Sequence, residues 1–351
     1  TEIGGVKIGM FGLSPVETPI VTHPKNVIGL TFADPIETAR AVVPNLRAEA
    51  DIVLCLSHLG YDTDLKLAAA VPGIDIIVGG HSHTEVPEPK LVGGAIVVQA
   101  GEWAKHLGVL EIEVVDGKIE SFGGGLVAMD ASRPNSAPDS GIETIIRKYN
   151  AALEDRMAQV VGHTKVALDG ERANVRTPTT NMSNLSTDAL REASGADIVR
   201  TNGGGIRASI PAGDISMGNV YTVLPFDNSL VVIELSGDKI LAALEHGLSS
   251  YPNQAGSFAQ VSGLTLRFDP SKPAGSRILE VLVAGEPLDP DRLYTVATND
   301  FMAAGGDGYV WFKEANIIFD SGEMLRDIVA GYLMEHESVE ASSEIRIVPV
   351  K

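Results

Sequence analysis

Cysteine, aromatic side chains and positive charge are all scarce in this sequence. Cys55 is the only cysteine in 351 residues, so no disulfide can form within the chain. No apolar run in the sequence reaches the roughly 18 residues that a membrane-spanning helix needs. The 46 Asp and Glu residues outnumber 27 Lys and Arg, giving a net charge of −19. Such a surface repels nucleic acid polymers and anionic membranes, whereas a small phosphate ester can still bind beside a few local cations.

The length exceeds the usual size of a single core, so we expect two domains. In the first part, short apolar runs predict strands at 6–13, 51–58 and 75–80. Helical patterns alternate with them at 34–50 and 62–71. Alternation on both sides of Asp116-Gly117 predicts a hairpin over 107–124. The first part therefore reads as an α/β domain with a mixed sheet.

Residues 130–138 are rich in proline and serine and read as a linker. The apolar spacing over 140–160 predicts an amphipathic helix that could bridge two domains. Beyond it a second α/β unit is predicted. Its strands are expected near 160–167, 197–201, 229–236, 261–268, 278–283, 293–298 and 344–349, and its helices near 181–194, 238–250 and 322–335.

Histidines follow two of the predicted strands in the first part. His58 comes after the run DIVLCLS, and His81 and His83 come after DIIVGG. Ligands collect at the carboxyl ends of strands in α/β sheets, and neutral imidazole is a good metal ligand. Gly79 and Gly80 would let the backbone turn sharply, so that both imidazoles of the second segment converge. The alternative is that these are loop histidines held by ordinary hydrogen bonds.

Three segments of the second part are candidate ligand-binding segments. TNGGGIR (201–207) exposes backbone amides beside an arginine, although a plain turn would use the same glycines. YTVLPFDN and NDFMAAGGDGY place Phe226 and Phe301 in polar surroundings, which predicts that both rings lie on loops. Two such rings can sandwich a planar base; the alternative is that each ring is a buried anchor of its loop.

Taken together, the motifs LSHLGYDTD, GGHSH, NMSNLSTDAL, TNGGGIRASIPAGDI, YTVLPFDN and NDFMAAGGDGY resemble those of the 5′-nucleotidase family. They stand in the family's order and extend through nearly the whole chain. The resemblance implies part of a calcineurin-like metallophosphoesterase domain at 1–130, a linker and bridging helix at 131–160, and a 5′-nucleotidase carboxy-terminal substrate domain at 161–351.

The resemblance also implies a two-metal phosphohydrolase of nucleotides, with zinc or manganese as the divalent ions. His58, His81 and His83 match metal ligands. Eight residues match positions that contact the nucleotide: Arg176 and Arg207 on phosphate, Asn202 and Gly205 in the glycine turn, Phe226 and Phe301 around the base, and Asn228 and Asp307 as polar partners of base and ribose. The second domain would deliver the ester to the metals, with the helix near 140–157 as a hinge.

Several family features do not occur in this chain. The Asp-x-His motif, the second aspartate and the Gly-Asn-His segment that carries the catalytic histidine should precede residue 1. We therefore assign no catalytic residue, and we expect the chain alone to be inactive, with a complementary amino-terminal fragment as a possible partner. A non-catalytic nucleotide-binding module is the alternative function. A third, related alternative is an enzyme of the same kind that acts on a UDP-sugar, a cyclic nucleotide or a thiosulfate-linked group.

The segment TTNMSN (179–184) also departs from the family, whose motif has a glutamate at the position of Thr179 and a glycine at that of Ser183. This change bears on fine specificity. The resemblance implies a periplasmic or extracellular location, although no signal peptide is visible in this chain.

Overall fold

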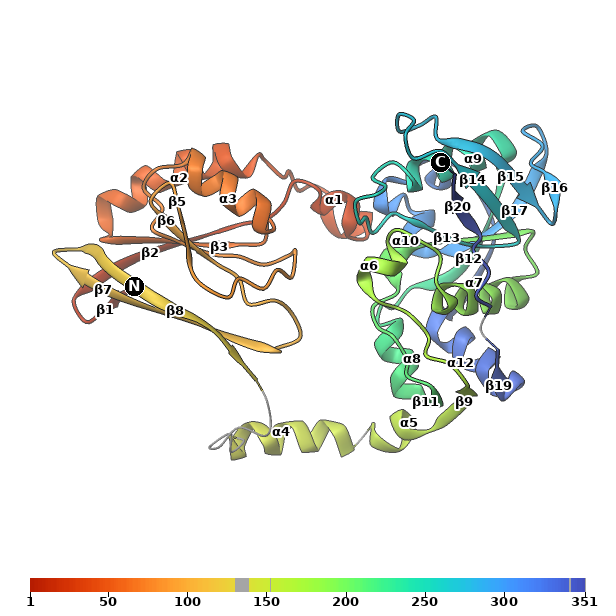
Figure 1. The fold of residues 1–351 in the computed structure, drawn as a ribbon, viewed down its shortest axis with the longest axis horizontal. Coiled ribbons are helices and arrows are strands. Elements are labelled where there is room, and N and C mark those ends of the chain that lie inside the picture. Colours follow the sequence, from red (N-terminus) through yellow and green to blue (C-terminus); the bar gives the residue numbers. More distant parts are fainter. Residues whose placement is uncertain (130–138, 152, 341, 351) are drawn as a thin grey trace. The chain divides into compact units, whose positions relative to one another are not determined.

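The computed structural model describes residues 1–129, 139–151, 153–340 and 342–350. The described chain forms two compact units: residues 1–19 with 29–139, and residues 20–28 with 140–351. The predicted linker at 130–138 lies outside the described residues. Within the described part, no helix is both long and apolar enough to cross a membrane. Figure 1 shows the elements of each unit.

The first unit is built on a six-stranded sheet in the order β1-β2-β3-β4-β6-β5. Its four central strands are parallel: β2 (Val6–Leu13), β3 (Ile52–Ser57), β4 (Ile76–Val78) and β6 (Ala95–Val98). The edge strands β1 (Glu2–Ile3) and β5 (Lys90–Val92) pair antiparallel to their neighbours. Parallel central strands require crossover connections, most often helices, and their carboxyl ends meet at one edge of the sheet.

Two helices supply the crossovers from β2 to β3 and from β3 to β4: α2 (Pro35–Glu49) and α3 (Tyr61–Ala70), which lie together on one side of the sheet in Figure 1. Asp34 begins α2 because its carboxylate accepts hydrogen bonds from the amides of Ile36 and Glu37, each 2.9 Å long. The hairpin of β7 (His106–Val115) and β8 (Lys118–Ala128) turns at Asp116-Gly117, as predicted, with positive φ at both residues.

The second unit is centred on a five-stranded sheet in the order β13-β10-β17-β12-β18. These strands are β13 (Ala259–Ser262), β10 (Ile198–Asn202), β17 (Leu293–Asn299), β12 (Ser229–Ser236) and β18 (Asn316–Met324). Alternate side chains of β12 enter different cores. Val231 and Ile233 pack with α9 (Gly237–Gly247), and Leu230 and Val232 pack with α7 (Asn181–Ser194) and α12 (Leu325–His336). Strand β12 is therefore buried on both faces of the sheet.

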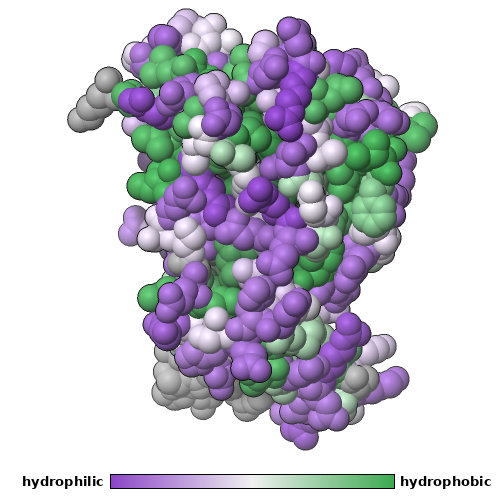
Figure 2. Space-filling view, turned by 90° about the vertical axis from the view of Figure 1, so that its right-hand side faces the viewer, coloured by the Kyte–Doolittle hydropathy of each residue, from purple (hydrophilic) through white to green (hydrophobic). Residues whose placement is uncertain are grey.

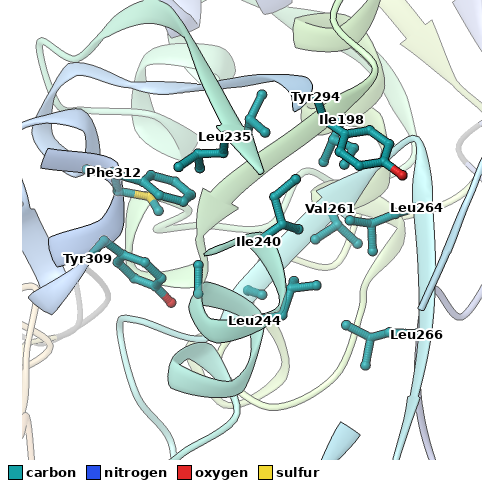
Figure 3. Close-up of a cluster of buried hydrophobic side chains, with 14 of the residues drawn as sticks. Ile198, Leu235, Ile240, Leu244, Val261, Leu264, Leu266, Tyr294, Tyr309 and Phe312 are labelled. Carbon is teal, nitrogen blue, oxygen red and sulfur yellow. The ribbon is translucent and has the colours of Figure 1, made fainter. Parts of the chain in front are cut away.

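Figure 3 shows the larger of these cores, where Ile240 and Leu244 of α9 lie among strand residues such as Leu235 and Val261. The rings of Tyr309 and Phe312 lie at one side of it, with centroids 5.3 Å apart. On the outside, hydrophilic residues cover most of the face seen in Figure 2, with smaller hydrophobic areas between them.

Two smaller sheets complete the second unit. One contains β11 (Gly213–Ser216), β9 (Val160–Thr164) and β19 (Ser338–Val339), and the other contains β16 (Glu286–Pro287), β15 (Ile278–Val283), β14 (Leu264–Phe268) and β20 (Ile347–Pro349). The remaining helices are α1 (Thr18–Val21), α4 (Ser140–Ala151), α5 (Glu154–Ala158), α6 (Arg172–Val175), α8 (Met217–Val223), α10 (Asp300–Ala303) and α11 (Val310–Lys313), with 3-10 turns η1 (Pro24–Val27), η2 (Gly203–Gly205) and η3 (Gly306–Gly308).

The mixed α/β fold is confirmed, with three corrections. The single strand predicted near 261–268 is two strands, because Gly263 takes a positive φ of 80° between them. The single helix predicted at 140–160 is two helices, α4 and α5. Strand β18 was not predicted, because most of its residues are exposed and it lacks a buried apolar run.

Candidate functional site

In the first unit, the candidate metal ligands follow β3 and β4 at the carboxyl edge of the sheet. His58 comes directly after β3, and His81 follows β4 by way of Gly79 and Gly80. The two imidazole rings meet edge to face, with centroids 5.0 Å apart and planes at 67°. Convergence was predicted for His81 and His83, whereas the ring contact in the structure joins His81 to His58.

The glycines before His81 serve a different purpose from the predicted one. The positive φ angles of this turn belong to the histidines, 70° at His81 and 58° at His83, and not to Gly79 or Gly80. A Cβ at Gly79 would lie 2.4 Å from the carboxylate of Asp64, and one at Gly80 would lie 3.2 Å from Nδ1 of His58. A side chain at Gly79 would overlap Asp64, and one at Gly80 would crowd His58, so the close approach of neighbouring side chains favours glycine at both positions.

Gln99 holds the same turn from the end of β6. Its side chain is 4% exposed. The amide nitrogen donates to the carbonyl oxygen of Gly80 at 3.1 Å, and the amide oxygen accepts from the Ser82 hydroxyl at 3.0 Å and the Thr84 backbone amide at 2.5 Å. One buried amide therefore fixes both ends of the segment that carries His81, which sequence reasoning did not identify.

His83 does not join the other two histidines in a three-residue metal group. Its Nδ1 lies 2.5 Å from a carboxylate oxygen of Glu102, while Nε2 of His81 lies 3.6 Å from Glu17. Among the described residues, no cluster of three or more His, Cys, Asp and Glu side chains could hold a metal ion. His58 and His81 fit two nitrogen ligands of such a site, and the assignment of His83 stays a prediction.

Asp64 is a fully buried acid beneath this edge. The Ser57 hydroxyl donates a hydrogen bond to its Oδ1. Burial raises the pKa of Asp64 to about 6, and the bond from Ser57 acts in the opposite direction. Its Oδ2 has no hydrogen-bond donor among the residues that the structure describes.

The second unit contains a small pocket where four of the predicted nucleotide contacts come together. Asn202, Gly205, Phe226 and Asn228 all line it. They come from β10, the glycine turn η2 and the loop between α8 and β12. The other lining residues are Ser186, Leu190, Thr201, Ile206, Leu224, Asn299 and Leu325. Apolar walls with a few amide groups are typical of a small-molecule site.

Asp307 belongs to the same site through Asn202. The amide nitrogen of Asn202 donates to Oδ2 of Asp307 at 2.7 Å, and the amide oxygen of Asn202 accepts from Asn299 at 3.2 Å. Burial raises the pKa of Asp307, and the positive charges of Arg200 and Arg176 oppose that rise. Arg176, predicted to contact the phosphate, thus acts electrostatically on Asp307, which was predicted to contact base or ribose.

Arg207 links the glycine turn to the loop that carries Phe226. Its backbone amide donates to the carbonyl oxygen of Val223 at 2.9 Å. Its guanidinium carbon lies 5.8 Å from the centre of the Phe226 ring, within the range of a cation–π contact. The ring itself is 46% exposed, so a large part of its surface remains open.

Phe301 differs from its prediction. It lies on the short helix α10 rather than on a loop, and its side chain is only 9% exposed. A Cβ at Gly306 would lie 2.3 Å from the Phe301 ring, so the ring packs directly on that glycine. The prediction that both phenylalanines lie on exposed loops is therefore wrong for Phe301, whereas its role in a base sandwich stays a prediction.

Arg200 is a buried cation behind this pocket that the sequence patterns did not reveal. It is 2% exposed, and its guanidinium carbon lies 3.7 Å from the centre of the Tyr309 ring. It donates to the Tyr309 hydroxyl and, at 3.1 Å, to the carbonyl oxygen of Ser257. Burial lowers the pKa of Arg200 to about 9, which still leaves it charged at neutral pH. Only its place inside the apolar run of β10 could have signalled it.

Comparison with known proteins places this geometry in a family. Residues 160–314 match the family model described as 5′-nucleotidase, C-terminal domain. The trifunctional nucleotide phosphoesterase protein YfkN of Bacillus subtilis is 38% identical over 90% of this chain and 22% of its own length. A 5′-nucleotidase of the ray Diplobatis ommata is 30% identical over 100% of this chain and 67% of its own length. The chain therefore spans only part of these relatives.

The likeness extends to solved structures. The crystal structure of a 5′-nucleotidase precursor from Thermus thermophilus superposes with a TM-score of 0.88 at 40% identity, covering 99% of this chain and 73% of that one. Identity at this level over most of both chains reflects common ancestry in addition to a common fold. The chain belongs to the 5′-nucleotidase family.

Proposed function

We propose that this chain is the nucleotide-binding part, with a portion of the metal centre, of a metal-dependent nucleotide phosphohydrolase. The observation that carries the proposal is the gathering of Asn202, Gly205, Phe226 and Asn228 around one pocket, with Asp307 bonded to Asn202. These residues come from separate segments of the second unit. The names of the relatives, nucleotide phosphoesterase and 5′-nucleotidase, support the same substrate class.

The roles of the pocket residues follow from their chemistry. The open face of Phe226 receives the base, because base–aromatic stacking contributes about 1–3 kcal/mol. Phe301 is proposed as the second ring. Asn202, Asn228 and Asp307 bond the polar edges of base and ribose.

Phosphate needs cations that can form paired hydrogen bonds. Arg207 lies directly beyond the glycine turn, and Arg176 acts on Asp307 at the same site. Guanidinium groups suit this task because their planar forks match phosphate oxygens. We assign both side chains to the phosphate.

Two divalent ions, zinc or manganese, are proposed for the intact enzyme. His58 and His81 would hold metal together with ligands that this chain does not supply. Metal ions in such sites lower the pKa of a bound water toward neutrality and stabilise the charge that develops on phosphorus. This chain's own contribution is to orient the imidazoles: Gln99 fixes the turn that ends in His81, and Gly80 leaves room beside His58.

A second candidate function is nucleotide binding without catalysis. The observation that favours it is the incomplete ligand set, since no group of three metal-binding side chains exists within the described residues. The open Phe226 ring supports a base-containing ligand over a thiosulfate-linked one.

The test is phosphate release by the full-length natural protein, with manganese or zinc, from AMP and from ribose 5-phosphate, an ester without a base. We expect a preference for AMP that falls about 5- to 100-fold in Phe226→Ala, with ribose 5-phosphate turnover unchanged. An equal preference in the wild type and Phe226→Ala would contradict the base site. AMP binding without phosphate release by the full-length natural protein would support the binding module, because the 351-residue chain alone is expected to be inactive under both proposals.

A further inference from the structure

We propose that Arg326, at the start of α12, is a positioning residue that holds the loop carrying Phe226, residues 224–228, in the shape that receives a base. The inference rests on the nucleotide-binding function proposed above. It assigns specificity to a side chain that does not line the pocket.

The guanidinium of Arg326 bonds three consecutive residues of the loop. Nη1 donates to the carbonyl oxygen of Phe226 at 3.1 Å and reaches that of Pro225 at 3.5 Å. Nη2 bonds the carboxylate of Asp227. The backbone on both sides of Phe226 is therefore attached to one rigid, planar group.

The guanidinium is itself fixed in place. Its carbon lies 4.6 Å from the centre of the Tyr221 ring on α8, and the side chain of Arg326 is 12% exposed. Asp227 is 77% exposed, so it contributes to this arrangement mainly through Arg326. A cation stacked on an aromatic ring and sheltered from water keeps a defined geometry.

The ends of the loop are held by backbone hydrogen bonds. The amide of Leu325 donates to the carbonyl oxygen of Asn228 at 2.9 Å, and the amide of Arg207 donates to that of Val223 at the same distance. The first two residues of α12 thus form hydrogen bonds with the loop at two places: Leu325 at its end and Arg326 in its middle.

Packing alone does not fix the Phe226 ring, because 46% of its surface is exposed. Without the guanidinium, the backbone at Phe226 becomes more mobile. Binding a base must then order this loop, and the conformational entropy lost in doing so weakens the affinity. Arginine is required because a lysine ammonium lacks the planar fork that serves two carbonyls and a carboxylate together. We therefore expect Arg326 to act on affinity for the base, with little effect on affinity for phosphate.

Isothermal titration calorimetry on the 351-residue chain tests this with two probes, adenosine and inorganic phosphate. We expect Arg326→Leu to bind adenosine about tenfold more weakly and phosphate within about twofold of the wild type. Arg326→Lys should recover part of the loss, and Asp227→Ala should show a smaller loss. The matched control is Arg267→Leu, which removes an exposed arginine of the same unit that lies 3.8 Å from Glu280.

Hydrogen exchange of the free protein gives a readout that needs no ligand. Amides of residues 224–228 should exchange faster in Arg326→Leu and at the wild-type rate in Arg267→Leu. Unchanged exchange in that loop, or wild-type adenosine affinity in a folded Arg326→Leu, would overturn the inference. Should Arg326→Leu fail to fold, Arg326→Lys and Asp227→Ala are judged by the same two criteria.

The outcomes separate this inference from the proposed function. If adenosine binding weakens in Phe226→Ala but not in Arg326→Leu, the base site stands and the positioning role fails. If the wild-type chain binds no adenosine at millimolar concentration, the proposed function fails, and the inference that depends on it fails as well.

Discussion

The amide nitrogen of Asn202 and the carboxylate of Asp307, 105 residues apart in the sequence, are joined by a hydrogen bond of 2.7 Å. Asn202 ends strand β10, and Asp307 lies in the turn η3 with a positive φ of 53°. The bond ties the glycine turn after β10 to the glycine-rich segment after α10. Both segments carry residues assigned to the nucleotide, so this contact sets the spacing of the pocket's polar groups.

Removing the amide of Asn202 should weaken the fold as well as the site. Asn202→Ala leaves a partly buried carboxylate and the amide of Asn299 without their partner. We expect the free energy of unfolding in urea to fall by about 1–3 kcal/mol. The control is Asn253→Ala, at an exposed position of the same unit. A change no larger than that of the control would contradict the structural role of this bond.

Gly203 and Gly205, both in the turn η2, should respond differently to alanine. A Cβ at Gly203 would lie 2.0 Å from the carbonyl oxygen of Val175, whereas a Cβ at Gly205 would have Asn202 as its nearest neighbour at 3.4 Å. Gly203→Ala should lower the free energy of unfolding by about 1–3 kcal/mol or more. Gly205→Ala should leave stability nearly unchanged and weaken adenosine binding, because Gly205 lines the pocket. Urea denaturation measures the stability of both variants, and calorimetry measures their affinity for adenosine. Equal losses of stability in the two variants would contradict this account.

Removing the ring of Phe301 should cost much more stability than removing the ring of Phe226. Phe301 is 9% exposed within the main core, so Phe301→Ala should lower the free energy of unfolding by about 3–5 kcal/mol. Phe226 is 46% exposed, so Phe226→Ala should change it by less than about 1 kcal/mol. Thermal and urea unfolding measure both; a large loss in Phe226→Ala would mean that this ring is a core anchor.

The raised pKa of Asp64 should make the stability of the first unit depend on pH. Its pKa in the folded state is about 6, above the ordinary value of about 3.9, so the folded state binds this proton more tightly. The stability that Asp64 contributes is present below about pH 4 and is lost as the pH rises through about 6. The free energy of unfolding of Asp64→Asn, which keeps an acceptor for Ser57, should therefore exceed that of the wild type by about 3 kcal/mol at about pH 8 and nearly match it near pH 4.

The control for this prediction is Asp62→Asn, an exposed carboxylate on the same helix. It should show the same difference from the wild type at both pH values. Urea denaturation at both the acidic and the alkaline pH gives the comparison. A difference between Asp64→Asn and wild type that does not change with pH would mean that Asp64 titrates normally.

Local sequence patterns predicted the central strands and main helices well, because buried apolar runs and helical periodicity are properties of short segments. Gly263 shows the limit of this approach: a single positive φ divides one apolar run into two strands belonging to different sheets. Phe301 shows another. Its polar neighbours in the sequence predicted a loop, but the packing of its ring on Gly306 buries it.

The candidate site was predictable where family motifs mark it and not elsewhere. Asn202, Gly205, Phe226 and Asn228 lie in recognisable segments and meet at one pocket. Arg326 and Arg200 have no motif of their own, because their importance comes from partners about 100 residues away in the sequence. Such contacts depend on tertiary structure and leave no local pattern.

The most direct test of the central claim, that the second unit binds a nucleotide by its base, is a crystal structure of the 351-residue chain with AMP. The account predicts the adenine ring stacked on Phe226, with Asn202 and Asp307 within hydrogen-bond distance of the nucleoside. It also predicts the phosphate beside Arg207. AMP bound away from Phe226, or no AMP bound at millimolar concentration, would contradict the claim.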